Sequence, residues 1–355
     1  MRLSILALAA ILATDTAQAG VIDLGSMMGN ANIYTIRNFS ATSSDVEGTV
    51  VAGGNVNISS YSINAAPNPN ARNEYALVAG GNVNLKGGSI DNGKMYAGGS
   101  VDLQWAAQPQ RSSENPIDFV AAAAYYQALS NDLSKVQSTG TVGTLWGGAV
   151  VTGSGLGGVD VFNVSADIFR TSHTWNLEKL VKGQTLIFNI SGANATFNDG
   201  GVSFEPLKDY NVLFNFPDAV SLNVKGIIGS VLAPNATVDA NWGVINGQVI
   251  VDTWNSTIQV NSNHYFTPVN VAGFRDAPPV VIPDHPVIVA PDPADVPEPG
   301  TLALMFAGVG MAMAARRVRR LPVQAWACVF VSCLKRRRAP LPGPAPAWPA
   351  PAARH

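Results

Sequence analysis

The polar side chains best suited to hold a ligand belong to one motif that the chain repeats three times. The copies occupy residues 51–58, 78–85 and 96–103, and each has a Gly-Gly pair followed by alternating polar and apolar residues. Such alternation is typical of a strand with one apolar and one polar face. The polar positions after the three Gly-Gly pairs are Asn55 and Asn57, Asn82 and Asn84, and Ser100 and Asp102.

These six residues form two ladders if the copies stack in register. The first ladder then holds Asn55, Asn82 and Ser100, and the second holds Asn57, Asn84 and Asp102. A flat polar face of this kind can hydrogen-bond polysaccharide hydroxyls or ordered water, and a repetitive surface suits a repetitive ligand. The alternative is that the ladders only stabilise the stacked strands. No spacing typical of a calcium loop is present, so the sequence predicts no metal and no cofactor.

The acid–base and nucleophilic residues do not form a recognisable catalytic set. His173 and His264 lie in the folded part and His285 in a proline-rich stretch, while the folded part has no Cys nucleophile and no G-x-S-x-G motif. Residues 153–158 fit the G-x-G-x-x-G fingerprint, but a strand-like alternation follows them where a dinucleotide site needs a helix. The prediction is a non-enzymatic protein without catalytic residues. A carboxylate-based polysaccharide hydrolase or lyase remains the alternative.

The spacing of the repeats predicts the elements that position the polar face. The second copy begins 27 residues after the first and the third 18 after the second, and Val231 to Val249 is again a step of 18 residues. This step matches one turn of a parallel β-solenoid better than the shorter strand spacing of a sandwich or barrel. Asn115 as N-cap and apolar residues at helical spacing predict one amphipathic helix over 116–136, packed on the sheet. The expected fold is therefore all-β with one long helix, a parallel β-helix with the helix alongside.

Charge and cysteine content narrow the class of protein. The chain has 355 residues, 13% of them charged, and a net charge of −2. Residues 20–296 hold 12 Lys and Arg against 22 Asp and Glu, a difference of −10, which argues against nucleic acid as a partner. Both cysteines, Cys328 and Cys333, lie in the tail, so no disulfide is expected in the folded part, and the pair is weak evidence for a metal site.

The two ends of the chain have the features of an exported protein. A basic start, an apolar run and Ala17-Gln18-Ala19 predict a signal peptide over 1–19. We expect a folded domain over 20–268 and an extended proline-rich linker over 269–295. Residues 321–355 form a basic tail rich in Pro and Ala.

A segment near the C-terminus resembles the PEP-CTERM sorting signal of exopolysaccharide-producing Gram-negative bacteria. It covers 296–320 and has the motif, the short apolar stretch and the basic cluster in the family's order, carried by Val296, Pro297, Glu298, Pro299, Arg316 and Arg317. The resemblance implies an exosortase as partner and a transient anchor in the inner membrane, and an ordinary C-terminal anchor is the alternative. The tail after residue 320 departs from the family, whose signals end soon after the arginines.

The folded part resembles the choice-of-anchor A family of surface adhesins. The likeness rests on Val46-Glu47-Gly48, on the Ala-Gly-Gly repeats, and on residues 215–219, 232–236 and 246–248. It implies an extracellular domain with an adhesive role, at the cell surface or in the extracellular matrix. We therefore expect a secreted adhesin that binds extracellular polysaccharide or acts in biofilm. The alternatives are an ice-binding-like protein and a polysaccharide-cleaving enzyme on a β-helix.

Overall fold

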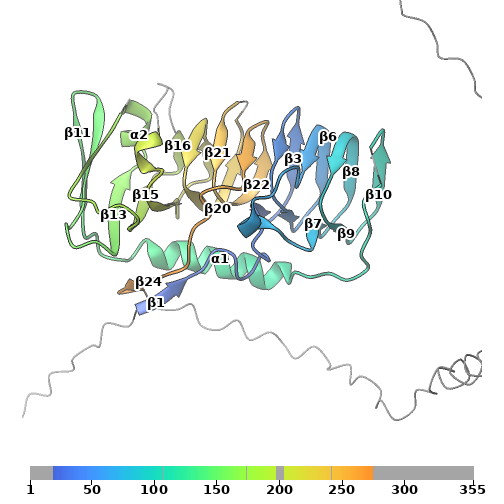
Figure 1. Ribbon diagram of the computed structural model, residues 1–355, viewed down its shortest axis with the longest axis horizontal. Helices are drawn as coiled ribbons and strands as arrows, with labels where there is room; N and C mark the ends of the chain where they lie inside the picture. The colour runs from blue at the N-terminus through green and yellow to red at the C-terminus, as the bar shows by residue number, and fades with distance from the viewer. Residues whose placement is uncertain (1–18, 107, 173, 197–203, 241, 275–355) are drawn as a thin grey trace, which may run out of the picture. The chain divides into compact units, whose positions relative to one another are not determined.

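The structure, a computed structural model, describes residues 19–106, 108–172, 174–196, 204–240 and 242–274 (Figure 1). The expected signal peptide up to residue 18, the membrane segment, the sorting motif and the tail lie outside these residues, as do His173 and His285. The expected linker begins inside them, because residues 269–272 form a strand. The boundaries proposed for the domain and for the segments around it remain predictions.

Most of the strands belong to one 19-stranded sheet in which every strand pair is parallel. The mostly β composition, the parallel sheet and the single long helix agree with the sequence-based prediction. The strands form three stacks, and we call the strands that lie at one level of the stacks a rung. Stack A is, in spatial order, β13 (Val159–Ser165), β15 (Thr185–Ser191), β17 (Asn211–Asn215), β20 (Ser230–Val238), β22 (Val249–Asn255), β2 (Ile33–Thr35), β5 (Val50–Ala52), β7 (Tyr75–Ala79) and β9 (Lys94–Ala97).

The other two stacks share several long strands. Stack B consists of β16 (Asn194–Thr196), β18 (Ser221–Asn223), the ends of β20 and β22, then β3 (Phe39–Thr42), β6 (Val56–Ile63), β8 (Val83–Ile90) and β10 (Val101–Gln104). Stack C consists of β19 (Gly226–Ile228), β21 (Val244–Asn246), β23 (Gln259–Asn261), β4 (Asp45–Val46) and the ends of β6 and β8.

The three sequence repeats stack in the expected register. Val83 lies opposite both Val56 and Val101, and Val249 lies opposite Val231. The Gly-Gly pairs make the corners between stacks A and B, where the chain of one rung lies almost against the next. A Cβ atom on Gly80 would come within 2.3 Å of the carbonyl oxygen of Gly53. Only glycine fits at such a corner.

Stack A is covered on its outer side by helix α1 (Phe119–Leu133), which runs beneath the strands in Figure 1. Its central strands are therefore buried on both faces, as in β5 and β7, whose residues are all buried. Packing on the sheet confirms the prediction for the helix, but the predicted start was wrong. Asp118 is the N-cap and its carboxylate accepts the N–H groups of Val120 and Ala121, so the helix begins three residues later than Pro116.

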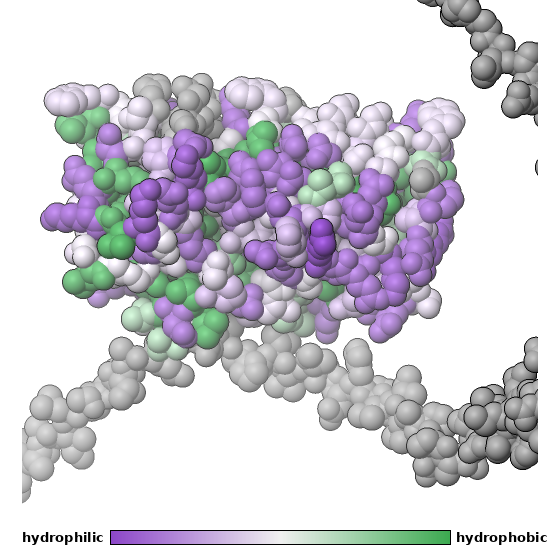
Figure 2. All heavy atoms as spheres, in the orientation of Figure 1, coloured by the Kyte–Doolittle hydropathy of each residue, from purple (hydrophilic) through white to green (hydrophobic). Residues whose placement is uncertain are grey.

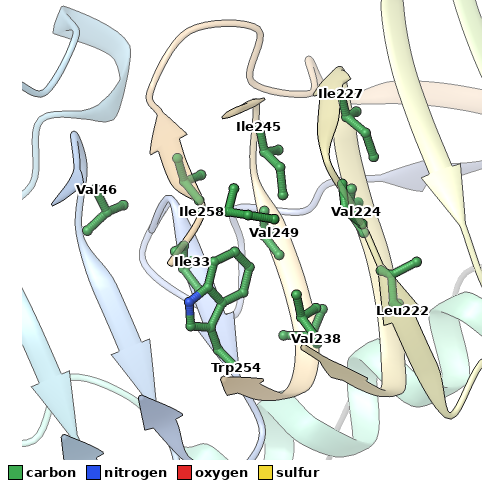
Figure 3. Packing of buried hydrophobic residues seen from close by; sticks show 14 of the residues in the cluster. Ile33, Val46, Leu222, Val224, Ile227, Val238, Ile245, Val249, Trp254 and Ile258 are labelled. Carbon is green, nitrogen blue, oxygen red and sulfur yellow. The ribbon is translucent and has the colours of Figure 1, made fainter. Parts of the chain in front are cut away.

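The space between the three stacks is filled by apolar side chains. Figure 3 shows Trp254 among aliphatic residues such as Val238 and Val249, which converge from neighbouring strands. Towards one end Phe162, Phe188 and Phe214 stack, with ring centroids 4.9 and 5.3 Å apart. The large side chains of the interior thus repeat from rung to rung, as the outer polar residues do.

The order of the rungs in space differs from their order in the chain. The chain starts in the middle of the sheet at β2, proceeds to β10 at one end, returns along α1 to β13 at the other end, and closes where β22 pairs with β2 (Figure 1). The amide of Asn32 donates to the carbonyl of Gly247 at 2.8 Å, and Glu47 accepts the N–H of Ser262 at 2.7 Å. Asn32 also accepts the N–H of Gly48 at 3.1 Å, so it bridges two of the motifs that carry the family resemblance, at 46–48 and 246–248.

The remaining elements lie around the sheet. β1 (Ala19–Ile22) pairs with β24 (Val269–Ala272) in an antiparallel ribbon next to α1 (Figure 1). A small sheet of β11 (Thr141–Leu145), β12 (Gly148–Thr152) and β14 (Trp175–Glu178) lies at the β13 end. Short helical turns are α2 (Asp167–Thr171), η1 (Pro69–Ala71) and η2 (Glu205–Leu207). Within the described residues, every helix is too short or too polar to span a membrane.

Candidate ligand-binding face

A groove of about 550 Å³ lies on the outer side of stack B, over β3, β6, β8 and β10. Its walls are mainly hydroxyl and amide side chains, with three charged residues among them. The polar residues that line it are Ser40, Thr42, Asn57, Ser59, Asn84, Lys86, Asp102, Gln104, Asp239, Asn255, Ser256 and Thr257. The side chains from β3, β6, β8 and β10 point outward because the alternate residues of these strands, such as Val56 and Val83, are buried inside.

The second predicted ladder lies in this groove. Asn57, Asn84 and Asp102 occupy matching positions on three successive rungs, and the amide nitrogen of Asn84 donates to Asn57 Oδ1 at 2.8 Å. The structure extends this row beyond the repeats, because Ser40 lies opposite Asn57 and Asn255 lies opposite Ser40. The row thus has five members on five rungs. Sequence reasoning missed Ser40 and Asn255 because neither follows a Gly-Gly pair.

The first predicted ladder lies beside the groove and has a different role. The side-chain oxygen of Asn55 accepts the backbone N–H of Asn82 at 2.8 Å, and Asn82 accepts that of Ser100 at the same distance. Asn38 continues the row on the other side by accepting the N–H of Asn55 at 2.9 Å. These amides satisfy backbone donors at the Gly-Gly corners, which is the structural interpretation of the ladder. The structure therefore places the six predicted site residues in two rows with different hydrogen-bond partners.

Charged and aromatic side chains lie at the two ends of the groove. Lys86 is placed over the ring of Trp105, with its ammonium 5.5 Å from the ring centroid, and Trp105 itself is 81% exposed. The carboxylate of Asp102 accepts the amide of Gln104 at 2.9 Å. Asp239 closes the opposite end. One ammonium and two carboxylates leave the groove with only a small negative charge among many neutral hydrogen-bonding groups.

The residues that could have supported catalysis are dispersed. Within the described parts of the chain, no group of three or more His, Cys, Asp or Glu side chains is placed to hold a metal ion. His264 lies in a bend after β23, with a positive φ of 53°, and is absent from the walls of the groove. The carboxylates of the groove come from β10 and from the segment after β20, so the lining presents no close acid–base pair of the hydrolase type.

The glycine-rich loop at 153–158 surrounds a buried carboxylate and leads into a strand. Asp160 accepts the side chains of Gln184 at 2.8 Å and Thr139 at 2.9 Å, and the backbone N–H of Ser154 at 3.1 Å. Burial alone would raise the pKa of Asp160, but these hydrogen bonds together lower it below its usual value. Strand β13 follows the loop, which agrees with the rejection of a dinucleotide site from the sequence.

Exposed apolar side chains gather at the other end of the domain. Figure 2 shows hydrophobic residues mainly around β11 and β13, whereas hydrophilic residues cover most of the rest of the visible face. Trp146, in the turn between β11 and β12, is 96% exposed, and Leu156 is 91% exposed. The groove and this apolar end are therefore separate surfaces.

Comparison with protein families gives two matches. Residues 26–262, more than half of the chain, match the family described as "Putative Ice-binding-like adhesive domain". The chain belongs to this family of ice-binding-like adhesive domains. Residues 295–320 match the PEP-CTERM protein-sorting motif. Searches against curated proteins and against solved structures gave no match.

The two matches confirm the family and the sorting signal inferred from the sequence. An ice-binding-like adhesive domain followed by an export sorting signal is the organisation of a surface adhesin. The PEP-CTERM motif implies exosortase processing, transient membrane anchoring and a Gram-negative host. Membership of an adhesive family favours a non-enzymatic role.

Proposed function

We propose that the ice-binding-like adhesive domain is a β-solenoid that attaches the protein to a neutral extracellular polysaccharide through the groove on stack B. The observation that carries this proposal is the row Asn255, Ser40, Asn57, Asn84 and Asp102, which runs across five parallel rungs along the groove. Such attachment would serve adhesion at the cell surface or within a biofilm matrix.

The spacing of the row supports a polymer as the ligand. Neighbouring parallel strands lie about 4.8 Å apart, so equivalent side chains recur at that interval along the groove. Over five rungs, which are four intervals, the row extends about 19 Å. A chain that lies across the strands meets the same kind of hydrogen-bonding group at every step, and many weak contacts then add up along one molecule.

The chemistry of the lining favours hydroxyl groups as binding partners. Asn side chains offer both a donor and an acceptor, as sugar hydroxyls do, so each can exchange two hydrogen bonds with a polyol. A polyanion would approach Asp102 and Asp239 and would be repelled, while Lys86 is already placed over Trp105. The exposed indole of Trp105 adds an apolar surface of the kind that packs on the C–H face of a sugar ring.

Binding of the host's exopolysaccharide to the purified protein tests this function. We expect saturable binding that falls at least tenfold in affinity in the double variant Asn57→Ala with Asn84→Ala. The matched control is Asn194→Ala, because Asn194 is an exposed asparagine of β16 outside the groove. Equal loss in the control would show that the groove is not the site.

Product analysis of the same samples separates binding from cleavage. New reducing ends or unsaturated sugars would contradict the non-enzymatic role. Absence of binding to every neutral polysaccharide, together with thermal hysteresis that the groove variants abolish, would instead establish ordered water as the ligand.

A further inference from the structure

The outer strands of stack A are covered at both ends of the large sheet, whereas β10 of stack B is not. At one end, the outer edge of β13 is occupied, because Thr139 and Gly140 donate their N–H groups to the carbonyl of Val161 at 2.9 and 3.2 Å. At the other end, β9 is occupied by residues 110–112, since Met95 donates to Gln110 and accepts from Ser112, both at 2.8 Å. Within the described residues, β10 pairs only with β8, and Figure 1 shows it as the last strand at its end.

The open edge of β10 carries unused backbone groups. The carbonyl of Ser100 accepts the N–H of Val83 at 2.9 Å, so Ser100 and then Asp102 direct their backbone groups toward β8. Successive residues of a strand direct these groups to opposite sides. Val101 and Leu103 therefore turn their N–H and C=O groups to the open edge. Their side chains are only half-buried, unlike the equivalent Val83 and Leu85 on the neighbouring rung.

We propose that β10 pairs with β10 of a second copy of the chain in an antiparallel, two-fold symmetric dimer centred on Leu103. In this register Leu103 exchanges two hydrogen bonds with Leu103 of the second copy, which uses the groups that face the open edge. Every residue then meets one that faces the same side of the sheet. Asp102 then lies opposite Gln104 of the second copy.

The side chains of β10 are complementary to themselves in this register. On the inner side, Leu103, which is only half-buried in the single chain, packs on its equivalent. On the outer side, Gln104 already donates to Asp102 of its own strand at 2.9 Å, and in the dimer it can make the same bond across the interface. If the register shifted by one residue, inward-facing residues of one copy would lie opposite outward-facing residues of the other, and all of these contacts would be lost.

A second copy fits this edge better than a peptide of another protein. A foreign strand could use the backbone groups, but the reciprocal pairing of Asp102 with Gln104 arises only when the sequence meets itself. The dimer also joins two grooves edge to edge, so that the polar surface of one copy continues into that of the other. This proposal is independent of which ligand the groove binds.

Disulfide trapping in the full chain tests the register. The variant Leu103→Cys is made in a background with Cys328→Ser and Cys333→Ser, which removes the native thiols. Residues in a hydrogen-bonded antiparallel pair have Cα atoms about 5.5 Å apart, within the range of a disulfide. We expect Leu103→Cys to form a covalent dimer on mild oxidation. The control is Thr144→Cys, at an exposed position of β11 at the opposite end, and its covalent dimer should be at least tenfold less abundant. Equal or greater trapping at Thr144→Cys would overturn the proposal.

A charge exchange tests the interface without a change in the core. Sedimentation of the full chain in mild detergent should show dimers. In Gln104→Glu we expect the dissociation constant of the dimer to rise at least tenfold, because the new carboxylate meets Asp102 of the second copy. The combined variant Asp102→Lys with Gln104→Glu should restore the dimer. A wild-type protein that stays monomeric at all concentrations, or a Gln104→Glu variant that dimerises unchanged, would show that β10 is not the interface.

Discussion

The side-chain oxygen of Asn55 accepts the backbone N–H of Asn82 across two rungs of the sheet, at 2.8 Å. Asn57, two residues later, instead points into the groove and accepts only the amide of Asn84. Asn55 therefore supports the backbone, whereas the backbone of neighbouring rungs does not depend on the side chain of Asn57.

Asn55→Ala should lower the free energy of unfolding by about 0.5–1.5 kcal/mol, the usual net value of one hydrogen bond. Asn57→Ala should change it by less than about 0.5 kcal/mol, as exposed substitutions do. Urea denaturation of both variants measures the difference. A larger loss for Asn57→Ala would contradict the division of the two ladders.

Gly80→Ala should destabilise the domain strongly. The added methyl group would lie 2.3 Å from the carbonyl oxygen of Gly53, and that oxygen belongs to a backbone corner that cannot rotate away. We expect a loss of about 1–3 kcal/mol, the range for overpacking. Gly143→Ala is the control, because no atom lies within 4 Å of the added methyl group there. Similar thermal midpoints for the two variants would argue against the close approach of the rungs.

Asn215→Ala should loosen helix α1. The amide of Asn215, which is fully buried, donates to the carbonyl of Ser130 at 2.9 Å and to Asn189 Oδ1 at 2.8 Å. Asn189 in turn donates to the carbonyl of Leu133 at the end of the helix, also at 2.8 Å. Removal leaves buried groups without partners, at a cost of about 1–3 kcal/mol. Hydrogen exchange should accelerate in α1, and exchange that stays unchanged there would show that apolar packing alone holds the helix.

Asp160 should make the stability of the domain depend on pH in the acid range. Its hydrogen bonds lower its pKa in the folded state relative to the unfolded value of about 3.9. Its contribution is therefore complete above that value and is lost as the pH falls through the lower, folded-state pKa. Asp160→Asn should lower stability near neutral pH and flatten the acid part of the profile. Unfolding profiles that remain parallel for the variant and the wild type would contradict this role.

The sequence predicted the rungs that carry the Gly-Gly pairs, because alternation and close glycine contacts leave a local pattern. It did not predict the asparagine row at 163, 189 and 215, although Phe162, Phe188 and Phe214 recur at intervals of 26 residues beside it. Strands β15 and β17 are buried on both faces and lack alternation, so the repeat shows only in the Phe-Asn pairs.

Two further features depended on contacts distant in sequence. Asn115 was a plausible N-cap, but its side chain accepts the N–H of Ile117 and the helix starts after Asp118. Ser40 and Asn255 belong to the groove only because β22 lies beside β3. Partners more than two hundred residues apart leave no trace in local spacing, so the extent of the candidate site could not be inferred from the repeats alone.

The pairing of β22 with β2 also governs how the domain can acquire its fold. Ile33 of β2 lies opposite Val249 of β22. The first rung therefore pairs with a strand that comes near the end of the domain in sequence. Closing so long a loop is entropically costly, and folds dominated by distant pairings form slowly. Because the chain is made from the N-terminus, one edge of β2 has no partner strand until the last strands have been made. An open strand edge can pair with other chains, so aggregation competes with completion of the fold for as long as this edge stays open.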